Sequence, residues 1–266
     1  MNESSPVTTN GHGNAPLYAP ALPMHHAKMS FQSVARTHPG VVRPHNEDAV
    51  LERGEAGIWA VSDGMGGHAA GDVASAVVID SLKGLTPTGD NFTSVNAVRD
   101  ALSWANSELY RRGSSLSPDR TMGATVTVLG ADAKNFFCLW AGDSRLYRFR
   151  GDRLTQLTRD HRYVQALIDS GLLDEADVEN HPRRSVITRA VGVDPELKLD
   201  QCEGPIEPGD VFLLMTDGVS GVCKDGDIAD ILSRLNLEDA ADRIVEQCLQ
   251  RGAPDNLSLI LVAAKS

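Results

Sequence analysis

Apolar and polar residues alternate with a period of two over much of this chain, and that pattern predicts many short β-strands. Several of these segments are separated only by turn residues, such as Gly151-Asp152, which favour a hairpin. The predicted strands cover residues 31–37, 49–52, 57–62, 123–129, 135–141, 145–150, 153–157, 186–190, 196–202, 210–216 and 256–263.

Other segments carry apolar residues at helical spacing, with polar residues on the opposite face. Val73, Val77, Val78 and Leu82 share one face of the first of them. The predicted helices cover residues 69–82, 94–112, 161–170, 227–235 and 238–251. Residues 172–184 are polar and mixed in charge, and we expect them to form an exposed, mobile segment.

Runs of strands interrupted by pairs of helices are typical of an α+β fold rather than of alternating βαβ units. Residues 1–28 are rich in Asn, Thr, Gly, Pro and Ala and lack either periodicity, so we predict a disordered N-terminal tail there. No internal repeat and no second linker follows. Residues 29–266 are therefore expected to form one domain.

Composition limits the partners and the location. The chain of 266 residues has a net charge of −11 and no Lys/Arg-rich cluster, which argues against a nucleic-acid partner. It has no apolar run near the ~20 residues that cross a bilayer, and its start lacks the features of a secretory signal. Four widely spaced cysteines without a CxxC pair (Cys138, Cys202, Cys223 and Cys248) are interpreted as reduced core thiols. We expect a cytoplasmic protein without a membrane partner.

Two carboxylates stand where apolar strands end. The run 58–62 is followed by Asp63-Gly64, and the run 211–215 is followed after one residue by Asp217-Gly218. Each Asp-Gly pair could be an ordinary turn. The repeated pattern, together with a third carboxylate at Asp255 before the last strand, instead favours a shared site for a hard cation, which prefers oxygen ligands.

Further polar clusters lie beside strand ends at 43–48, 141–145 and 252–256. Taken in order, the clusters resemble the motifs of PPM-type phosphatases, the protein phosphatase 2C family. The resemblance extends from about Met29 to the C-terminus, and the variant Asp63-Gly64-Met65-Gly66-Gly67 is similar to the bacterial branch. The matching segments are 43–49, 61–68, 123–125, 141–145, 157–161, 187–192, 215–218 and 254–256.

The resemblance implies a central antiparallel β-sandwich flanked by helices on both faces, with a binuclear Mn²⁺ or Mg²⁺ site at one end. By analogy, Asp63 bridges the two metals, Asp217 and Asp255 complete the first, and the carbonyl oxygen of Gly64 contributes to the second. Members of the bacterial branch often hold a third metal, for which Asp143 and Asp217 would be the ligands. Asp143 could also be a plain turn residue beside Gly142.

The implied activity is hydrolysis of phosphoserine and phosphothreonine by attack of a metal-bridging water or hydroxide, because two cations neutralise phosphate charge and lower the pKa of that water. Arg43 would grip the phosphate through its planar fork, unless it is an ordinary surface arginine. Glu47 and Asp48 would lie beside the metal ligands, and Asn256 would brace the Asp255 loop. The expected partners are phosphorylated proteins and a bacterial Ser/Thr kinase that the enzyme opposes, and the chain is expected to be monomeric.

One position departs from the pattern. Eukaryotic relatives often have a histidine directly after Asp-Gly, proposed as the general acid, whereas this chain has Met65, which cannot donate a proton. Either metal-bound water or His68 could take that role. Arg145 is expected to form a structural ion pair, and His161 to cap or orient its helix.

Two other functions remain open. An inactive regulatory module that binds a phosphoprotein is disfavoured, because Asp63, Asp217 and Asp255 are all present. A hydrolase of small phosphate esters is the second alternative. Only residues 172–184, at the variable flap position of the family, could bias that choice, and their sequence does not decide it.

Overall fold

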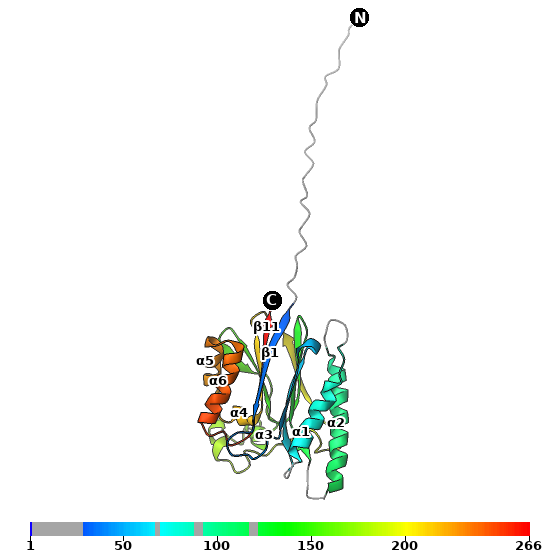
Figure 1. Ribbon diagram of the computed structural model, residues 1–266, viewed down its shortest axis with the longest axis vertical. Coiled ribbons are helices and arrows are strands. Elements are labelled where there is room, and N and C mark those ends of the chain that lie inside the picture. The colour runs from blue at the N-terminus through cyan, green and yellow to red at the C-terminus, as the bar shows by residue number, and fades with distance from the viewer. Residues whose placement is uncertain (2–28, 67–69, 88–92, 117–121) are drawn as a thin grey trace.

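Two antiparallel sheets form the centre of the molecule (Figure 1). The computed structural model describes residues 1, 29–66, 70–87, 93–116 and 122–266; the predicted tail and His68 lie outside these ranges. The first sheet has the order β1 (Ser30–His38), β11 (Leu257–Lys265), β10 (Val211–Met215), β7 (Arg145–Arg150) and β8 (Arg153–Gln156). The second has the order β2 (Asp48–Arg53), β3 (Ile58–Met65), β5 (Val126–Ala131), β6 (Asn135–Ala141) and β9 (Asp200–Pro205), and β4 (Gly123–Ala124) pairs with β3.

The period-two pattern divides each strand between two cores. In β3, Trp59 and Val61 point between the sheets, whereas Ile58 and Ala60 point to the opposite face. Phe212 of β10 meets Phe136 of β6 across the gap, with ring centroids 5.0 Å apart. The layer between the two sheets is therefore a packed apolar core.

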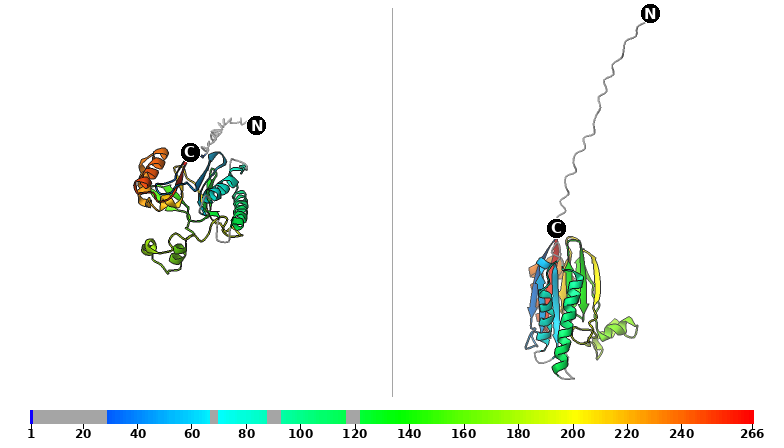
Figure 2. Two further views of the ribbon diagram at one scale, coloured as in Figure 1. Left: turned by 60° about the horizontal axis from the view of Figure 1, so that its bottom comes forward. Right: turned by 90° about the vertical axis from the view of Figure 1, so that its right-hand side faces the viewer.

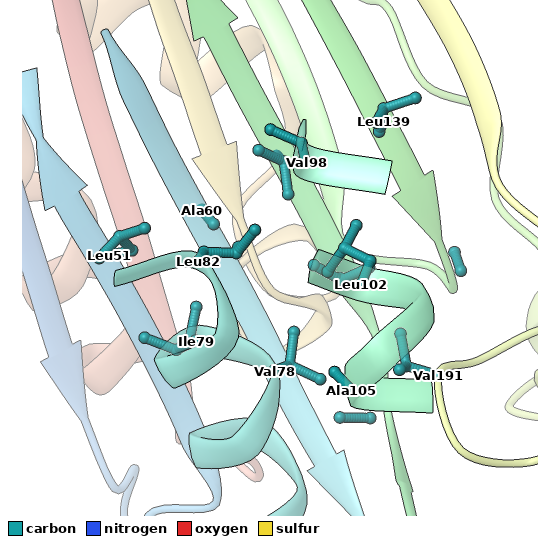
Figure 3. Close-up of a cluster of buried hydrophobic side chains, with 14 of the residues drawn as sticks. Leu51, Ala60, Val78, Ile79, Leu82, Val98, Leu102, Ala105, Leu139 and Val191 are labelled. Atoms are coloured by element: carbon teal, nitrogen blue, oxygen red, sulfur yellow. The ribbon is translucent and has the colours of Figure 1, made fainter. Parts of the chain in front are cut away.

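Helices cover the outer face of each sheet, so the predicted four-layer sandwich is confirmed. Helices α1 (Gly71–Lys83) and α2 (Val95–Leu116) pack on the second sheet through Val78, Leu82 and Leu102 (Figure 3). Helices α5 (Asp225–Arg234) and α6 (Leu237–Gln250) cover the first sheet. Of the described helices, none has the length and apolar character needed to cross a membrane.

A small flap projects from the side of the sandwich (Figure 2). We define it as residues 163–186, which contain α3 (Tyr163–Asp169) and a 3₁₀ helix at Glu175–Asn180. Its two ends meet at an isolated bridge between Arg162 and Ile187. The exposure predicted for residues 172–184 is confirmed, while their mobility stays a prediction.

Several predicted boundaries were wrong for a common reason, namely pairing with distant segments. Residues 186–190 form no strand. Ile187 pairs with Arg162 at the base of the flap, and Val191, just after this segment, pairs with Ala124. The strand predicted at 196–202 lies at Asp200–Pro205. The strand predicted at 123–129 is interrupted between β4 and β5, where the amide of Thr125 donates to the carbonyl of Asp63 (2.8 Å). Sequence analysis also missed a short helix, α4 (Asp217–Ser220), and a 3₁₀ turn at Gly54–Ala56.

The cysteines are unpaired, as predicted from the sequence. All four cysteines are free, and Cys138, Cys223 and Cys248 are buried, while Cys202 is partly exposed on β9.

Candidate metal centre

Asp63 lies at the centre of a group of carboxylates. It lies two residues before the end of β3, directly opposite Asp48 of β2, an arrangement that is unfavourable when both are charged. The pKa of Asp63 is raised well above its usual range, first by burial and then by the negative charges of Asp48, Asp217, Asp143 and Asp255. Carboxylates from distant parts of the sequence therefore share one electrostatic environment.

Asp217 joins this group because β10 ends beside it. It is the first residue of α4, and burial raises its pKa to about 7, with the charge of Asp143 as the next cause and Arg162 acting in the opposite direction. Asp255 lies just before β11, the neighbour of β10. Adjacent antiparallel strands thus bring Asp217 and Asp255 to the same end of the sandwich.

Asp48 is held by a threonine that sequence analysis did not select. The hydroxyl of Thr216 donates to Oδ2 of Asp48 (2.9 Å), while Oδ1 is buried without a hydrogen-bond partner among the described residues. Burial raises the pKa of Asp48 to about 6. A buried acceptor with no donor is unusual in a folded protein and is available to a cation.

Asn256 ties together the loops that carry Glu47 and Asp255. Its Nδ2 donates to the carbonyl oxygens of Pro39 (2.8 Å) and His45 (2.9 Å), and its Oδ1 accepts from the amide of Glu47 (2.8 Å). Its own amide donates to Oδ1 of Asp255 (2.9 Å). The geometry is that of a brace, with no sign that Asn256 itself is a metal ligand.

Gly64 follows Asp63 at a point of very close backbone packing. Its amide donates to the carbonyl of Glu47 (3.1 Å), and a Cβ at this position would lie 1.9 Å from the carbonyl oxygen of Gly71. Only glycine fits, because any side chain would collide with backbone that cannot move aside. The role of the Gly64 carbonyl as a ligand stays a prediction.

Arg43 lies at the rim of the carboxylate group. Its Nη2 contacts Oδ2 of Asp255 at 2.7 Å, and about half of its side chain is exposed. That hydrogen bond is the main cause that raises the pKa of Arg43, and the charges of Glu47 and Asp63 contribute. Exposed ion pairs are weak, so Arg43 can exchange its carboxylate partner for a phosphate.

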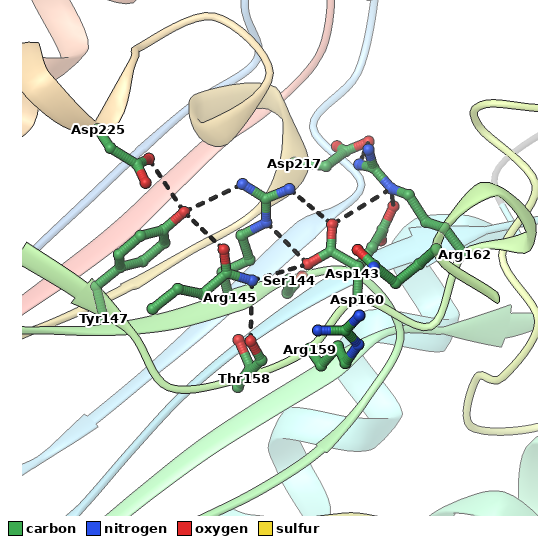
Figure 4. Close-up of polar contacts among 12 residues, drawn as sticks. Asp143, Ser144, Arg145, Tyr147, Thr158, Arg159, Asp160, Arg162, Asp217 and Asp225 are labelled. Carbon is green, nitrogen blue, oxygen red and sulfur yellow. Dashed lines mark hydrogen bonds and ion pairs between the residues drawn. The ribbon is translucent and has the colours of Figure 1, made fainter. Parts of the chain in front are cut away.

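Asp143 lies in the turn between β6 and β7 and is only 2% exposed. Its Oδ2 accepts from Nε of Arg162 (2.6 Å), and its Oδ1 is buried without a hydrogen-bond partner among the described residues. Nearby, Arg145 makes two hydrogen bonds to Asp160, at 2.8 and 2.7 Å, which confirms its structural ion pair (Figure 4). Arg162 was not identified from the sequence.

His161 supports the Asp143 turn and does not cap α3, whose N-cap is Arg162, so the capping role was wrong, while the alternative that it orients the helix stays a prediction. Its Nδ1 accepts from the amide of Gly142 (3.1 Å), its ring stacks on Trp140, and its Nε2 lies 3.2 Å from Asp200. Burial is the main cause that lowers its pKa. This network assigns the neutral tautomer with the proton on Nε2.

A pair of buried hydroxyls connects the Asp143 turn to Asp63. Thr125 Oγ1 lies 2.8 Å from Ser144 Oγ and accepts from the amide of Asp63 (3.0 Å). Both residues fall within segments that carried the family resemblance, but nothing in the sequence specified this contact. It fixes the spacing between Asp63 and Asp143 through the protein interior.

The residues present fit divalent cations. The donors are carboxylate oxygens, two of them buried without hydrogen-bond partners among the described residues, and burial together with their mutual repulsion raises the pKa of Asp63. Within the described ranges no three His, Cys, Asp or Glu side chains close into a ready-made cage. Mg²⁺ retains several waters and needs few direct carboxylates, so an open group of this kind suits such an ion.

An antiparallel sandwich covered by helices on both faces, with carboxylates gathered at one end, defines the PPM class of phosphatases. The chain belongs to the protein phosphatase 2C family, whose sequence model matches residues 43–263. It is 36% identical over 234 residues to the serine/threonine protein phosphatase PstP of Mycobacterium tuberculosis (strain ATCC 25618 / H37Rv). That alignment covers 85% of this chain and 44% of the relative, so the chain spans less than half of that protein's length.

Solved structures share the whole fold. PppA, described as a key regulatory component of the T6SS in Pseudomonas aeruginosa, is similar with a TM-score of 0.80 and 40% identity, over 88% of this chain and 98% of that one. The catalytic domain of PstP in complex with two manganese ions is similar with a TM-score of 0.80 and 31% identity, over 90% of this chain and 100% of that one.

Proposed function

We propose that this chain is a metal-dependent phosphatase that hydrolyses phosphoserine and phosphothreonine in proteins. The observation that carries the proposal is the group of mutually repelling carboxylates around Asp63, with Arg43 at its rim. The name of PstP and its complex with two manganese ions support both the reaction and the kind of cofactor.

Asp63, Asp217, Asp255 and the carbonyl of Gly64 are proposed to hold two Mn²⁺ or Mg²⁺ ions. The third ion that the resemblance implies between Asp143 and Asp217 stays a prediction, because Arg162 already lies 2.6 Å from Asp143. When bound, such ions neutralise phosphate charge and lower the pKa of a coordinated water. The carboxylates supply the compensating negative charge, and bound cations would favour the ionised forms of Asp63 and Asp217, whose pKa values burial and neighbouring carboxylates raise.

Arg43 is proposed to bind and orient the phosphate. Its guanidinium presents two parallel donors that match two phosphate oxygens, and its exposure leaves it accessible to a substrate as large as a protein. Met65, at the end of β3, has no proton to give, and His68 lies outside the described residues. The source of the leaving-group proton therefore stays a prediction, with His68 and water as the candidates.

Phosphorylated proteins are the proposed substrates, and a bacterial Ser/Thr kinase is the proposed opposing partner. We propose one catalytic domain at residues 29–266. The monomeric state, the cytoplasmic location and the lack of a nucleic-acid partner stay predictions from the sequence.

The test measures release of phosphate from a phosphothreonine peptide and from p-nitrophenyl phosphate, with Mn²⁺ and with excess EDTA. Chelation should abolish both activities and Mn²⁺ should restore them. Asp63→Asn should reduce turnover by more than the roughly 10–100-fold that loss of an outer partner of a metal site costs. Asp80→Asn, which alters only an exposed ion pair on α1, is the matched control.

Three results would overturn the proposal. Activity that survives chelation would exclude the metal mechanism. Binding of a phosphoprotein without hydrolysis would indicate the regulatory module. Turnover of the small ester with none of the phosphopeptide would indicate the small-ester hydrolase.

A further inference from the structure

Arg162 places a positive charge among three carboxylates (Figure 4). Its Nε lies 2.6 Å from Oδ2 of Asp143 and 3.8 Å from Oδ2 of Asp160, and its Nη2 lies 3.7 Å from Oδ2 of Asp217. Only 20% of its side chain is exposed. An arginine so enclosed is held in one place and is not a mobile surface group.

Asp160 already has another partner. Arg145 contacts both of its carboxylate oxygens, so the charge of Asp160 is matched without Arg162. The nearest partner of Arg162 is Asp143 (2.6 Å), and Asp217 lies at 3.7 Å; these are the two carboxylates to which the family resemblance assigned a third metal.

We propose that the guanidinium of Arg162 takes the place of a third divalent cation between Asp143 and Asp217. The inference rests on the proposed cation-binding function, because it concerns how many cations this chain holds beside Asp63. A guanidinium and a metal ion cannot both fill the space against Oδ2 of Asp143, since that oxygen already lies in hydrogen-bond contact with Nε.

Arg162 differs from a metal ion because it is covalently attached to the base of the flap. Its backbone pairs with Ile187, the amide of Tyr163 donates to Val186 (2.8 Å), and the amide of Thr188 donates to His161 (2.7 Å). The contact with Asp143 therefore attaches the base of the flap to the carboxylate group. Arg162 acts as a positioning residue, because it reaches the site through Asp143 and Asp217.

Loss of the arginine should open a cation site. Oδ1 of Asp143 has no hydrogen-bond partner among the described residues, so Arg162→Ala would leave both oxygens of this buried carboxylate free for an incoming ion. A buried charge left without a partner is costly, which favours uptake of Mn²⁺. A lysine at this position keeps the positive charge but loses the planar fork.

The experiment counts Mn²⁺ bound per chain by calorimetric titration and by elemental analysis after gel filtration. Arg162→Ala should bind one more Mn²⁺ than the unaltered chain, and Arg162→Lys should bind the same number as the unaltered chain. Arg162→Ala combined with Asp143→Ala should lose the additional ion. Arg159→Ala, which removes an exposed arginine paired with Asp169, is the control and should leave the count unchanged.

A second measurement follows hydrogen exchange of the flap amides without metal. Arg162→Ala should speed exchange in residues 163–186, and saturating Mn²⁺ should not restore protection, because a bound ion is not attached to the flap. A count that is equal in Arg162→Ala and the unaltered chain, with every variant shown to be folded by circular dichroism, would overturn the inference. Failure of the proposed function would look different, because the unaltered chain would then bind no Mn²⁺ at all.

Discussion

Asn256→Ala tests whether the candidate metal centre depends on a hydrogen-bonded brace. Asn256 is 5% exposed, and its side chain makes three hydrogen bonds, to Pro39, His45 and Glu47. At about 1 kcal/mol of net stability for each hydrogen bond, their loss should reduce the free energy of unfolding by about 3 kcal/mol. Partners left buried and unpaired would increase that cost.

The same substitution at Asn236 is a matched control. Asn236 caps α6, where its Oδ1 accepts from the amide of Asp239 (3.0 Å), and loss of such a cap costs about 1 kcal/mol. Asn236 takes no part in the carboxylate group, so Asn236→Ala should leave Mn²⁺ affinity unchanged. Asn256→Ala should weaken it, because the loops of Glu47 and Asp255 lose their common partner.

Urea denaturation gives the two free energies, and calorimetric titration gives the two Mn²⁺ affinities. Asn256→Asp extends the comparison. This variant keeps an acceptor for the amide of Glu47 but places a carboxylate oxygen against the carbonyl oxygens of Pro39 and His45. Its free energy of unfolding should therefore recover as the pH falls and the new carboxyl is protonated. The brace would be refuted if Asn256→Ala cost no more than Asn236→Ala and bound Mn²⁺ equally well.

Three further predictions concern the metal-free chain, the glycine packing and the tail. Burial raises the native-state pKa values of Asp48 (to about 6) and Asp217 (to about 7) above the ordinary 3.8. At a pH between 3.8 and these values the native state binds more protons than the unfolded state, so stability without metal should fall as pH rises from 5 to 8. A Tm that rises over this range without metal would contradict the prediction. Gly64→Ala should cost roughly 3 kcal/mol or more through backbone overlap, whereas Gly84→Ala, with no atom within 4 Å of its new Cβ, should be nearly neutral in urea. Deletion of residues 1–27 should leave Tm and activity on a small ester nearly unchanged, and a fall of many degrees would show packing on the domain.

Local pattern was sufficient to predict an α+β chain and the position of Asp63 and Asp217 just after apolar runs, whereas the sandwich was implied by the family resemblance. The apolar run before Asp217 ends with β10 at Met215, whereas β3 continues past Asp63 to Met65. The position of Arg43 and Asn256 beside these carboxylates came from the order of motifs in the resemblance, which periodicity alone does not provide.

The errors occurred where a residue's partner lies far away in the sequence. Residues 186–190 have the sequence pattern of a strand, but they lie at the base of the flap, where Ile187 pairs with Arg162 instead of with a strand of the sheet. His161 precedes a helix and resembles a cap, yet its ring lies against Trp140 and the Gly142 turn. Arg162 has three acidic neighbours in the structure, and no spacing rule specifies them.

The pairing of β1 with β11 has a practical consequence for handling the molecule. Ser30 lies opposite Lys265, and His38 lies opposite Leu257, so the start of β1 and the end of β11 emerge side by side at the end of the sandwich far from Asp255 (Figure 1). A strand of nine residues spans about 30 Å. A dye, an affinity handle or a solid support coupled at the C-terminus would therefore lie at the opposite end of the sandwich, and an immobilised chain would still expose its carboxylate group to the proposed phosphoprotein substrate.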